Sequence, residues 1–266
     1  MERFEPEFIS IGELLSIRNS SDDSERTGLQ TGFNRLDEML GGLNGGDFVV
    51  IGGRPAMGKT ALALNMISSI AVENKVPCMV LSLEETKERM LERLVSMNEG
   101  QCIEKLSQSQ IFISDDPTIT MAELGGQCRK RKKENDIGLI IIDGYNDSSL
   151  GENKRAQSAL PRTLKRLALE LDTPIVLFSN ISRTADYRKK HIPMISDLEN
   201  YNEFIHFADA ILFLLRDDYY SSHSKKSRSI AKLYMEYHRR NRMTGCVALE
   251  WQEAYNSFRE PILRCL

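Results

Sequence analysis

Disulfide and metal-binding patterns are missing from this 266-residue sequence. The five cysteines are widely scattered, no Cys-x-x-Cys pair occurs, and the four histidines stand singly. An odd, unpatterned set of cysteines favours reduced thiols over a disulfide framework or a zinc site. We therefore expect neither a disulfide scaffold nor a metal cluster built from histidine and cysteine.

Export and membrane-spanning signals are missing as well. The first residues, MERFEPEFISIGELL, are too acidic and too interrupted for a signal peptide. No apolar run approaches the length that would span a membrane. We expect a soluble, cytoplasmic protein without a membrane partner.

The sequence also has no excess of positive charge. It contains 35 basic and 38 acidic residues, which gives a formal net charge of -3. The whole molecule is therefore not electrostatically attracted to nucleic acid, and any polyanion would have to bind local basic loops or copies arranged in a ring. The length allows one large α/β domain with a substantial core.

Short apolar runs alternate with helical stretches along most of the chain. The runs expected to form strands cover residues 47–53, 77–84, 111–116, 138–143 and 174–180. Stretches with helical character follow them, notably 59–72, 119–135 and 155–171. Continuous apolar strands separated by helices predict a mostly parallel sheet with helices on both faces. From residue 210 onward, consecutive runs joined by polar turns predict antiparallel strands at the end of the sheet.

Two further segments each allow two interpretations. Residues 8–18, FISIGELLSIR, form a short amphipathic segment before a polar linker, and this segment is either a frayed terminal helix or a helix that docks on another subunit. The basic run RKRKK at 129–133 is either a nucleic-acid patch or a solvated helix face, and its helical context favours the solvated face.

The chemistry is concentrated in the stretch GRPAMGKT, which lies between an apolar strand and a helix. Its pattern, G-x-x-x-x-G-K-T, is formed by Gly53, Gly58, Lys59 and Thr60. Glycines let successive backbone N–H groups converge on phosphate oxygens, the lysine neutralises phosphate charge, and the threonine hydroxyl ligates Mg²⁺. The residues expected to bind ATP are Gly53, Arg54, Pro55, Ala56, Met57, Gly58, Lys59, Thr60 and Ala61.

Two acidic residues stand at the ends of other predicted strands. Asp143 closes the run GLIIID, at the sheet edge where ligands bind, and fits a second anchor for Mg²⁺ better than a helix cap. Glu84 ends PCMVLSLE and is a plausible general base for an attacking water. Glu85 is the rival, but an acid in its place suits the start of the following helix.

At this point the sequence resembles a known family. The phrases TGFNRLDEMLGGLNGGD, GRPAMGKTALALN, SLEET, IGLIIID and SNISR occur in the order found in the RecA-like ATPase domain of DnaB-type replicative helicases. The later SDLENYNEFIHFADAILFLLRD fits as well. The resemblance covers residues 27–255 and implies a linker helix and linker at 1–26, followed by a RecA-like ATPase domain at 27–266.

The resemblance implies a hexameric, ATP-driven translocase on single-stranded DNA, with ATP bound between subunits. Glu84 would be the catalytic base and Asp143 would hold Mg²⁺. Asn180 stands where the family usually has a glutamine that senses the γ-phosphate. The family's trans-acting basic pair matches His238 and Arg240 in 238-HRRN-241. A guanidinium placed against a neighbour's γ-phosphate would make activity depend on assembly. The alternative, an exposed polar strand end at HRR, is less favoured than this role for Arg240.

The family's DNA contacts are less well preserved. After Asp143 the family continues with Tyr-Leu-Gln-Leu, whereas here Gly144 comes next, and Glu199 stands where a phosphate-contacting arginine follows the SDL phrase. Residues 183–194 could compensate as a basic funnel in a ring channel, or they are a solvated loop. The candidate DNA-contacting residues in this loop are Arg183, Arg188, Lys189 and Lys190.

The leading interpretation is therefore an ATP-hydrolysing helicase motor, with a helicase loader or primase as further possible partners. The altered DNA contacts favour a second interpretation, a nucleotide-gated ring or scaffold ATPase of replication or recombination that does not unwind DNA. A third, a RecA-fold recombination or clock-type ATPase, shares the phrase TGFNRLDEMLGGLNGGD but not the form GRPAMGKT.

Overall fold

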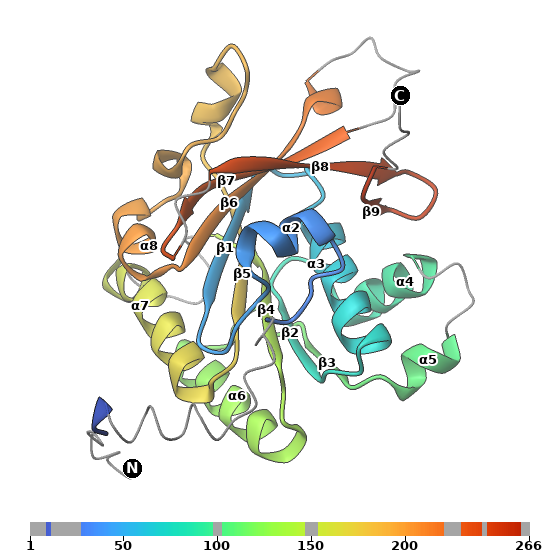
Figure 1. The fold of residues 1–266 in the computed structure, drawn as a ribbon, viewed down its shortest axis with the longest axis vertical. Helices are drawn as coiled ribbons and strands as arrows, with labels where there is room; N and C mark the ends of the chain where they lie inside the picture. The colour runs from blue at the N-terminus through green and yellow to red at the C-terminus, as the bar shows by residue number, and fades with distance from the viewer. Residues whose placement is uncertain are drawn as a thin grey trace.

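The fold is known from a computed structural model of residues 1–266, drawn in Figure 1. The structure describes residues 9–11, 28–97, 103–146, 154–220, 230–240 and 244–261. Of the predicted N-terminal segment at 8–18, only residues 9–11 are described, so the choice between a frayed helix and a docking helix lies outside the described residues.

A nine-stranded sheet forms the centre of the described structure, with the order β3-β2-β4-β5-β1-β6-β7-β8-β9. The strands are β1 (Phe48–Gly53), β2 (Cys78–Ser82), β3 (Ile111–Ser114), β4 (Leu139–Tyr145), β5 (Ile175–Asn180), β6 (Ala210–Arg216), β7 (Ile230–His238), β8 (Gly245–Gln252) and β9 (Ser257–Arg259). The first six strands pair in parallel. Strands β6 to β9 pair in antiparallel fashion. The predicted fold class is confirmed.

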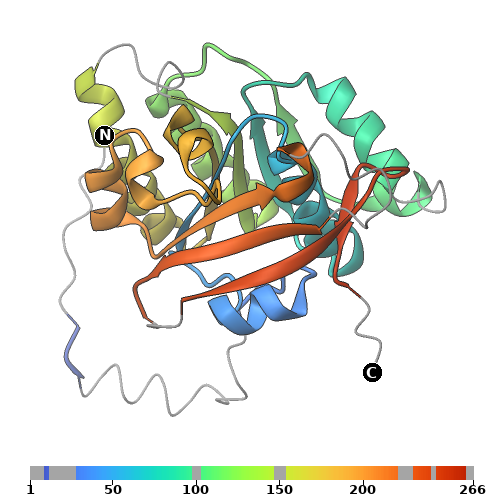
Figure 2. The same ribbon diagram turned by 90° about the horizontal axis from the view of Figure 1, so that it is seen from above.

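Helices lie on both faces of the sheet, as Figures 1 and 2 show. The longer ones are α2 (Asn34–Leu40), α3 (Lys59–Ile67), α4 (Lys87–Met97), α5 (Ile103–Gln108), α6 (Met121–Asn135), α7 (Lys154–Leu171) and α8 (Tyr201–Phe207). A π-helical turn at Ser68–Glu73 continues α3, and short 3₁₀ helices occupy Arg183–Tyr187, Ile195–Asp197 and Asp217–Tyr219. The helix predicted at 59–72 is thus present, but its second part is wound more widely.

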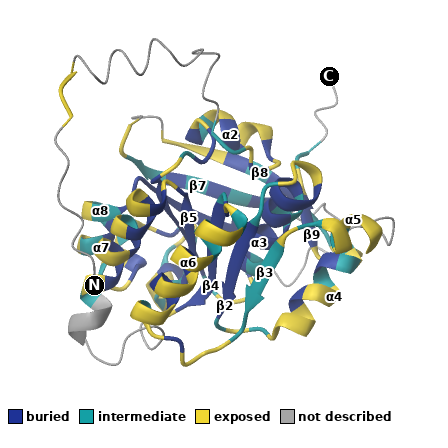
Figure 3. Ribbon diagram, turned by 90° about the horizontal axis from the view of Figure 1, so that it is seen from below, coloured by how far each residue is buried: buried dark blue, intermediate teal, exposed yellow. Residues whose placement is uncertain are grey.

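The core consists of two hydrophobic layers, one on each face of the sheet. The first part of β4, residues 139–142, is apolar at every position because Ile141 packs with α3 in one layer and Ile142 packs with α7 in the other. Successive strand residues point to opposite faces, so a strand covered on both sides needs no polar alternation. Figure 3 shows these buried strands between helices with exposed outer surfaces.

The basic run 129–133 lies on α6, a helix that begins with a capping box between Thr120 and Glu123. Arg129 pairs with Glu170 of α7, and Lys132 pairs with Asp136 four residues later. These ion pairs fit the solvated helix face that the sequence favoured. None of the described helices is long and apolar enough to cross a membrane.

Candidate nucleotide site

The stretch GRPAMGKT connects β1 to α3 at the carboxyl edge of the sheet, as the sequence predicted. β1 lies between β5 and β6, so the ends of several parallel strands meet around this loop. Gly58 has φ +97 at the N-cap of α3, and a side chain there would meet Phe258 at 2.8 Å. Glycine is required at this position both for its backbone conformation and for the close approach of the C-terminal strand.

The loop residues form a continuous surface around the start of α3. Gly53 ends β1, while Lys59, Thr60 and Ala61 begin α3, so the first free N–H groups of the helix face the loop. Pro55 and Ala56 are exposed, whereas Met57 is fully buried and anchors the loop beneath them. This arrangement fits a cradle for an anion, because free N–H groups and the positive helix end point the same way.

Lys59 is held in place by oxygen atoms although its side chain is almost fully buried. Its Nζ donates to the carbonyl oxygens of Gly53 at 3.0 Å and Arg54 at 3.2 Å, and to Asn180 Oδ1 at 2.8 Å. Burial lowers the pKa of Lys59, and the carboxylates of Glu84 and Asp143 oppose that shift. The ammonium group is thus poised among acceptors that phosphate oxygens can replace.

Asp143 is the most unusual group at this edge. It is 1% exposed, and neither carboxylate oxygen has a hydrogen-bond partner among the described residues. Burial raises its pKa to about 6, against the smaller opposing effects of the nearby Thr60 hydroxyl and the Lys59 ammonium. A buried carboxylate without a partner is costly unless something compensates its charge. Asp143 and Thr60 together therefore fit the oxygen ligands that Mg²⁺ prefers.

Glu84 and Asn180 complete the cluster. β2 ends at Ser82, so Glu84 lies on the bend just after the strand rather than within it. Asn180 Nδ2 donates to Glu84 Oε1 at 2.7 Å, while the Oδ1 of the same amide accepts from Lys59. Asn180 therefore connects the predicted general base to the phosphate-loop lysine. Glu85 points elsewhere, because Arg93 of α4 donates to its Oε1 at 2.6 Å.

Sequence reasoning missed a network that connects the phosphate loop to the segment after β5. Arg54 Nε donates to both carboxylate oxygens of Asp186, at 3.2 and 3.1 Å, and its Nη1 donates to the carbonyl of Ile181 at 2.9 Å. Tyr220 donates its hydroxyl to Asp186 at 2.6 Å, and His191 stacks on Tyr220 with ring centroids 4.0 Å apart. Arg54 and Asp186 lie far apart in the sequence, so no local sequence pattern indicated this network.

The predicted DNA-contacting residues divide into two groups. Arg188 donates to both oxygens of Asp197, at 2.6 and 2.7 Å, and this pairing lowers the pKa of Asp197 although burial opposes it. The guanidinium of Arg188 is therefore engaged within its own segment. Arg183, Lys189 and Lys190 are exposed, as is Tyr187 with 85% of its surface accessible.

His238 and Arg240 lie at the opposite, amino edge of the sheet. β7 runs antiparallel to β6 and places His238 beside Ala210, the first residue of β6. Arg240 follows and donates to Asp47, the residue just before β1, at 2.5 Å. Because β1 is six residues long, about 20 Å of strand separates Arg240 from the phosphate loop of the same chain.

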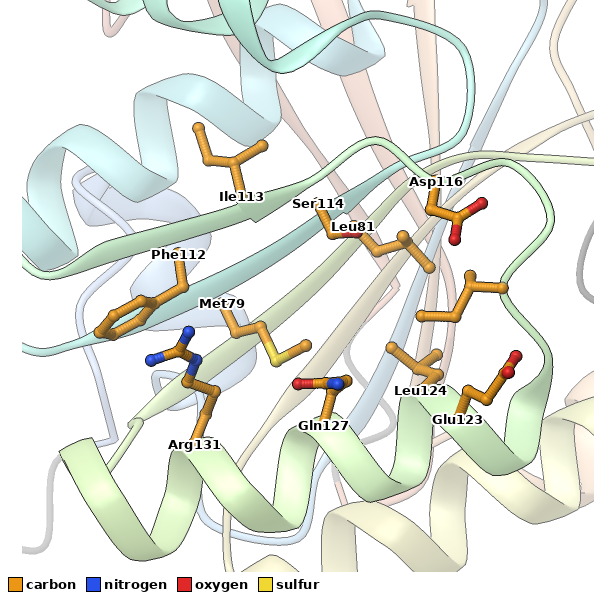
Figure 4. A pocket seen from close by; sticks show the side chains of 11 residues that line it. Met79, Leu81, Phe112, Ile113, Ser114, Asp116, Glu123, Leu124, Gln127 and Arg131 are labelled. Atoms are coloured by element: carbon orange, nitrogen blue, oxygen red, sulfur yellow. The ribbon is translucent and has the colours of Figure 1, made fainter.

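Two of the surface cavities formed by the described residues bear on the predicted sites. One, of about 310 Å³, opens between β2, β3 and α6, where Arg131 stacks over Phe112 at 4.4 Å (Figure 4). The residues that line it include none of the predicted site residues, all of which lie in the described ranges. A second, of about 560 Å³, lies beside the segment after β5 and is lined by Lys189, Lys190 and Lys232 together with Tyr220 and Tyr234.

Comparison with known proteins decides the family. The sequence model of the DnaB-like helicase C-terminal domain matches residues 28–101 and 98–260. The chain belongs to the DnaB-like helicase C-terminal domain family. This membership supports the DnaB-type interpretation over the wider group of RecA-fold recombination and clock ATPases.

Individual relatives agree with the family match. The chain is 31% identical, over 89% of its length, to the replicative DNA helicase DnaB of Geobacillus stearothermophilus. Among solved structures, a chain described as an ATPase domain superposes with a TM-score of 0.84 at 28% identity, covering 96% of this chain and 100% of that one. A DnaB-like replicative helicase, studied for its interactions with primase, superposes with a TM-score of 0.81 at 27% identity and covers 96% and 68%. The chain spans 57% of the length of the Geobacillus protein.

Proposed function

We propose that this chain is the ATP-hydrolysing motor of a ring-shaped helicase that moves along single-stranded DNA. The observation that carries the proposal is the cluster of Lys59, Glu84, Asp143 and Asn180 at one sheet edge, around a phosphate-binding loop. The buried carboxylate of Asp143, unpartnered among the described residues, is the strongest part of it, because this group fits a bound cation. Family membership supports the same conclusion.

Each residue of the cluster has a distinct task in the proposed hydrolysis. The loop N–H groups and Lys59 bind the phosphates of ATP, and Thr60 and Asp143 hold Mg²⁺. The metal, when bound, offsets negative charge on the phosphates. Glu84 accepts a proton from the attacking water. Asn180 orients Glu84 and Lys59 through its amide, and phosphate binding changes this contact because Lys59 must turn toward the new oxygens.

Arg240 acts on the nucleotide of a neighbouring subunit. Its place at the amino edge keeps it away from its own phosphate loop, and its side chain is 55% exposed despite its contact with Asp47. A guanidinium that enters a neighbour's site stabilises charge in the transition state, so hydrolysis depends on assembly. His238, the last residue of β7, precedes it by two residues and is the other member of the proposed basic pair. A hexameric ring provides this contact to every subunit.

The DNA strand contacts the outer part of the segment after β5. Arg183, Lys189 and Lys190 are exposed there, and Tyr187 offers an open aromatic face. The positive charge of lysines attracts the phosphate backbone, and aromatic rings stack on bases without sequence preference. Arg188 instead fixes the segment through Asp197. The exposed Glu199 opposes phosphate binding at its own position.

Primase and a helicase loader are the proposed protein partners, and residues 1–26 the proposed linker to an adjacent subunit. One of the superposed structures is described by its interactions with primase. The second candidate function is a nucleotide-gated ring or scaffold that does not unwind DNA. Glu199 and the internal pairing of Arg188 favour it, because both reduce the charge available to a strand.

Steady-state ATP hydrolysis with and without oligo-dT tests the proposal, with a sizing measurement under the same conditions. The matched control is Lys59→Ala, which removes the ammonium that contacts two carbonyl oxygens of the loop and Oδ1 of Asn180. We expect hydrolysis by a hexamer, stimulation by oligo-dT, and loss of both in the control.

The other outcomes separate the candidates. Hydrolysis that depends on Lys59 but is indifferent to DNA would favour the scaffold. Hexamers that bind nucleotide without hydrolysing it, with or without DNA, would contradict the roles given to Glu84 and Arg240. Equal hydrolysis by the control variant would exclude this loop as the active site.

A further inference from the structure

β4 contains one residue more than β5 between two aligned positions. Ile142 pairs with Leu177, but the next pair is Tyr145 with Ser179, so three steps along β4 match two along β5. This bulge contains Asp143 and Gly144, and Gly144 has φ +84. The extra residue turns Tyr145 into the same hydrophobic layer as Ile142, instead of the layer of Ile141.

The bulge lies directly against the predicted general base. Leu83 donates its N–H to the carbonyl of Asp143 at 2.9 Å, so the chain after β2 continues alongside β4. The next residue, Glu84, therefore crosses over Gly144. A Cβ built on Gly144 would lie 2.6 Å from Cγ of Glu84 and 3.1 Å from both its Cβ and its Cδ.

All three nearest atoms to that added Cβ belong to Glu84. The aliphatic part of Glu84 thus rests on the bare backbone of Gly144, while Asn180 donates to its carboxylate at 2.7 Å. Any side chain at position 144 must push Glu84 away, since real Cβ atoms essentially never approach another heavy atom to 2.6 Å. The side chain of Glu84 is exposed and can be displaced toward solvent.

We propose that Gly144 is a positioning residue for hydrolysis: the bulge in β4 leaves a space without a side chain in which Glu84 lies and from which its carboxylate meets Asn180. The proposal rests on the proposed function, because it requires Glu84 to act on the attacking water. It gives Gly144 a role through Glu84, beyond that of a residue that permits a positive φ.

The experiment compares Gly144→Ala with Gly41→Ala. Gly41 is a matched control because it also has a positive φ, +73, but an added Cβ there meets no atom of the described residues within 4 Å. Both variants place alanine at a positive φ, and only Gly144→Ala displaces Glu84. We expect Gly144→Ala to lower kcat by about 10²-fold, the scale expected for a catalytic group misplaced by about 1 Å. KM and the affinity for a non-hydrolysable ATP analogue should stay within about twofold of wild type because the phosphate loop is untouched.

Gly144→Asn keeps the test valid if Gly144→Ala does not fold. Asparagine tolerates positive φ better than alanine but carries the same Cβ, so it separates backbone strain from displacement of Glu84. A folded Gly144→Asn with wild-type kcat would overturn the proposal. A loss of kcat in Gly41→Ala equal to that in Gly144→Ala would overturn it as well.

A second background separates this proposal from the proposed function. In Glu84→Gln, which has already lost the base, Gly144→Ala should cause no further loss of single-turnover hydrolysis, because the two changes act through one group. A further loss there of the same size would assign Gly144 a role independent of Glu84 and overturn the proposal. Wild-type hydrolysis that is lost in Lys59→Ala, together with unchanged turnover in Gly144→Ala, would contradict only the role of Gly144. No hydrolysis by wild type would overturn both.

Discussion

The two edges of the sheet carry the two halves of the proposed chemistry, and they are built differently. At the carboxyl edge Lys59 is 6% exposed and Asp143 is 1% exposed. The Asn180 side chain there forms hydrogen bonds with both Lys59 and Glu84. At the amino edge Arg240 is more than half exposed and rests on Asp47. One edge is organised before any ligand arrives, whereas the other presents a charged side chain outward.

In the proposed function, this difference follows from what each edge of the sheet binds. A nucleotide phosphate needs donors and a cation site already in place, so the carboxyl edge accepts the penalty of burying ionisable groups. A residue that acts on a neighbouring subunit must reach across the interface between the two subunits, so its side chain has to remain accessible to solvent in a single chain. Substitutions at either edge, and in the segment after β5, can test this contrast.

Arg240→Ala should lower the hydrolysis rate of the assembled ring by about 10³-fold or more, because it removes charge stabilisation supplied to the neighbour's transition state. The matched control is Arg239→Ala, which removes the adjacent guanidinium from its contacts with Asp209 and the carbonyls of His206 and Ala208. Steady-state kinetics of both variants, with sizing to confirm assembly, make the comparison. Equal losses in both would show that the amino edge is needed only as structure.

Asp143→Asn should stabilise the metal-free protein against unfolding. The same substitution should impair ATP hydrolysis, because it removes the carboxylate proposed to hold Mg²⁺. The pKa of Asp143 in the folded protein is about 6, above its ordinary value of 3.8. The free energy of unfolding of wild type therefore falls as pH rises between about 4 and 6, and it stays low at higher pH. A difference of about two pKa units corresponds to about 3 kcal/mol, an upper limit for the gain from the variant at about pH 8.

Chemical unfolding in EDTA measures this gain across pH. The gain should shrink to nearly nothing below about pH 4, where the Asp143 carboxyl group of wild type is protonated in both the folded and the unfolded state. Magnesium and ATP should then stabilise wild type more than Asp143→Asn. A variant no more stable than wild type at about pH 8 would mean that Asp143 carries no unpaired charge.

Lys189→Ala with Lys190→Ala should weaken single-strand binding while leaving hydrolysis without DNA unchanged. If both lysines contact phosphates, the slope of log K against log salt should become shallower by about 1.4. Titrations of labelled oligo-dT at several salt concentrations measure this slope. The control is Lys130→Ala with Lys133→Ala, which removes two exposed lysines from α6. The same change in slope in the control would mean that the lysines act only through overall charge.

Tyr220→Phe should have the smallest effect. It removes the hydroxyl that donates to Asp186 at 2.6 Å, and Asp186 in turn holds Arg54 of the phosphate loop. A loss of about 1 kcal/mol is typical for one such hydrogen bond, or roughly a fivefold change in an equilibrium constant. We expect stimulation by oligo-dT to fall by this factor, while hydrolysis without DNA stays near wild type.

Tyr219→Phe is the control for this effect, because Tyr219 is an exposed neighbour that packs edge-on against Tyr220. Hydrolysis rates with and without oligo-dT are compared in the two variants. Unchanged stimulation in Tyr220→Phe would exclude the Asp186 network as a link between the strand segment and the phosphate loop.

The sequence predicted the carboxyl edge well because its determinants are local. GRPAMGKT is continuous, and an acid such as Asp143 at the end of a parallel strand must lie at the same sheet edge as the loop. The hydrogen bond between Glu84 and Asn180 was not predicted, because spacing along the sequence does not show which side chains meet at a sheet edge. The bulge at Gly144 escaped prediction, because register between neighbouring strands depends on both strands.

Ion pairs between distant segments were harder to predict. Arg188 was expected to contact DNA, but it is paired with Asp197, a choice that depends on how the segment after β5 folds back. The partner of Arg54 was equally hidden, since Asp186 lies 132 residues further along the chain. Charged side chains in a single sequence show which charges are available, and only the fold shows which of them are neutralised internally.

Mixed assemblies can show whether the carboxyl edge of one subunit is completed by the amino edge of the next. Lys59→Ala and Arg240→Ala subunits, each inactive alone, would be co-assembled in equal amounts and their hydrolysis measured. In a closed head-to-tail ring, about a quarter of the interfaces then pair an intact phosphate loop with an intact Arg240. We expect hydrolysis to recover up to about that fraction of the wild-type rate. Co-assembled rings that remain inactive would contradict this expectation.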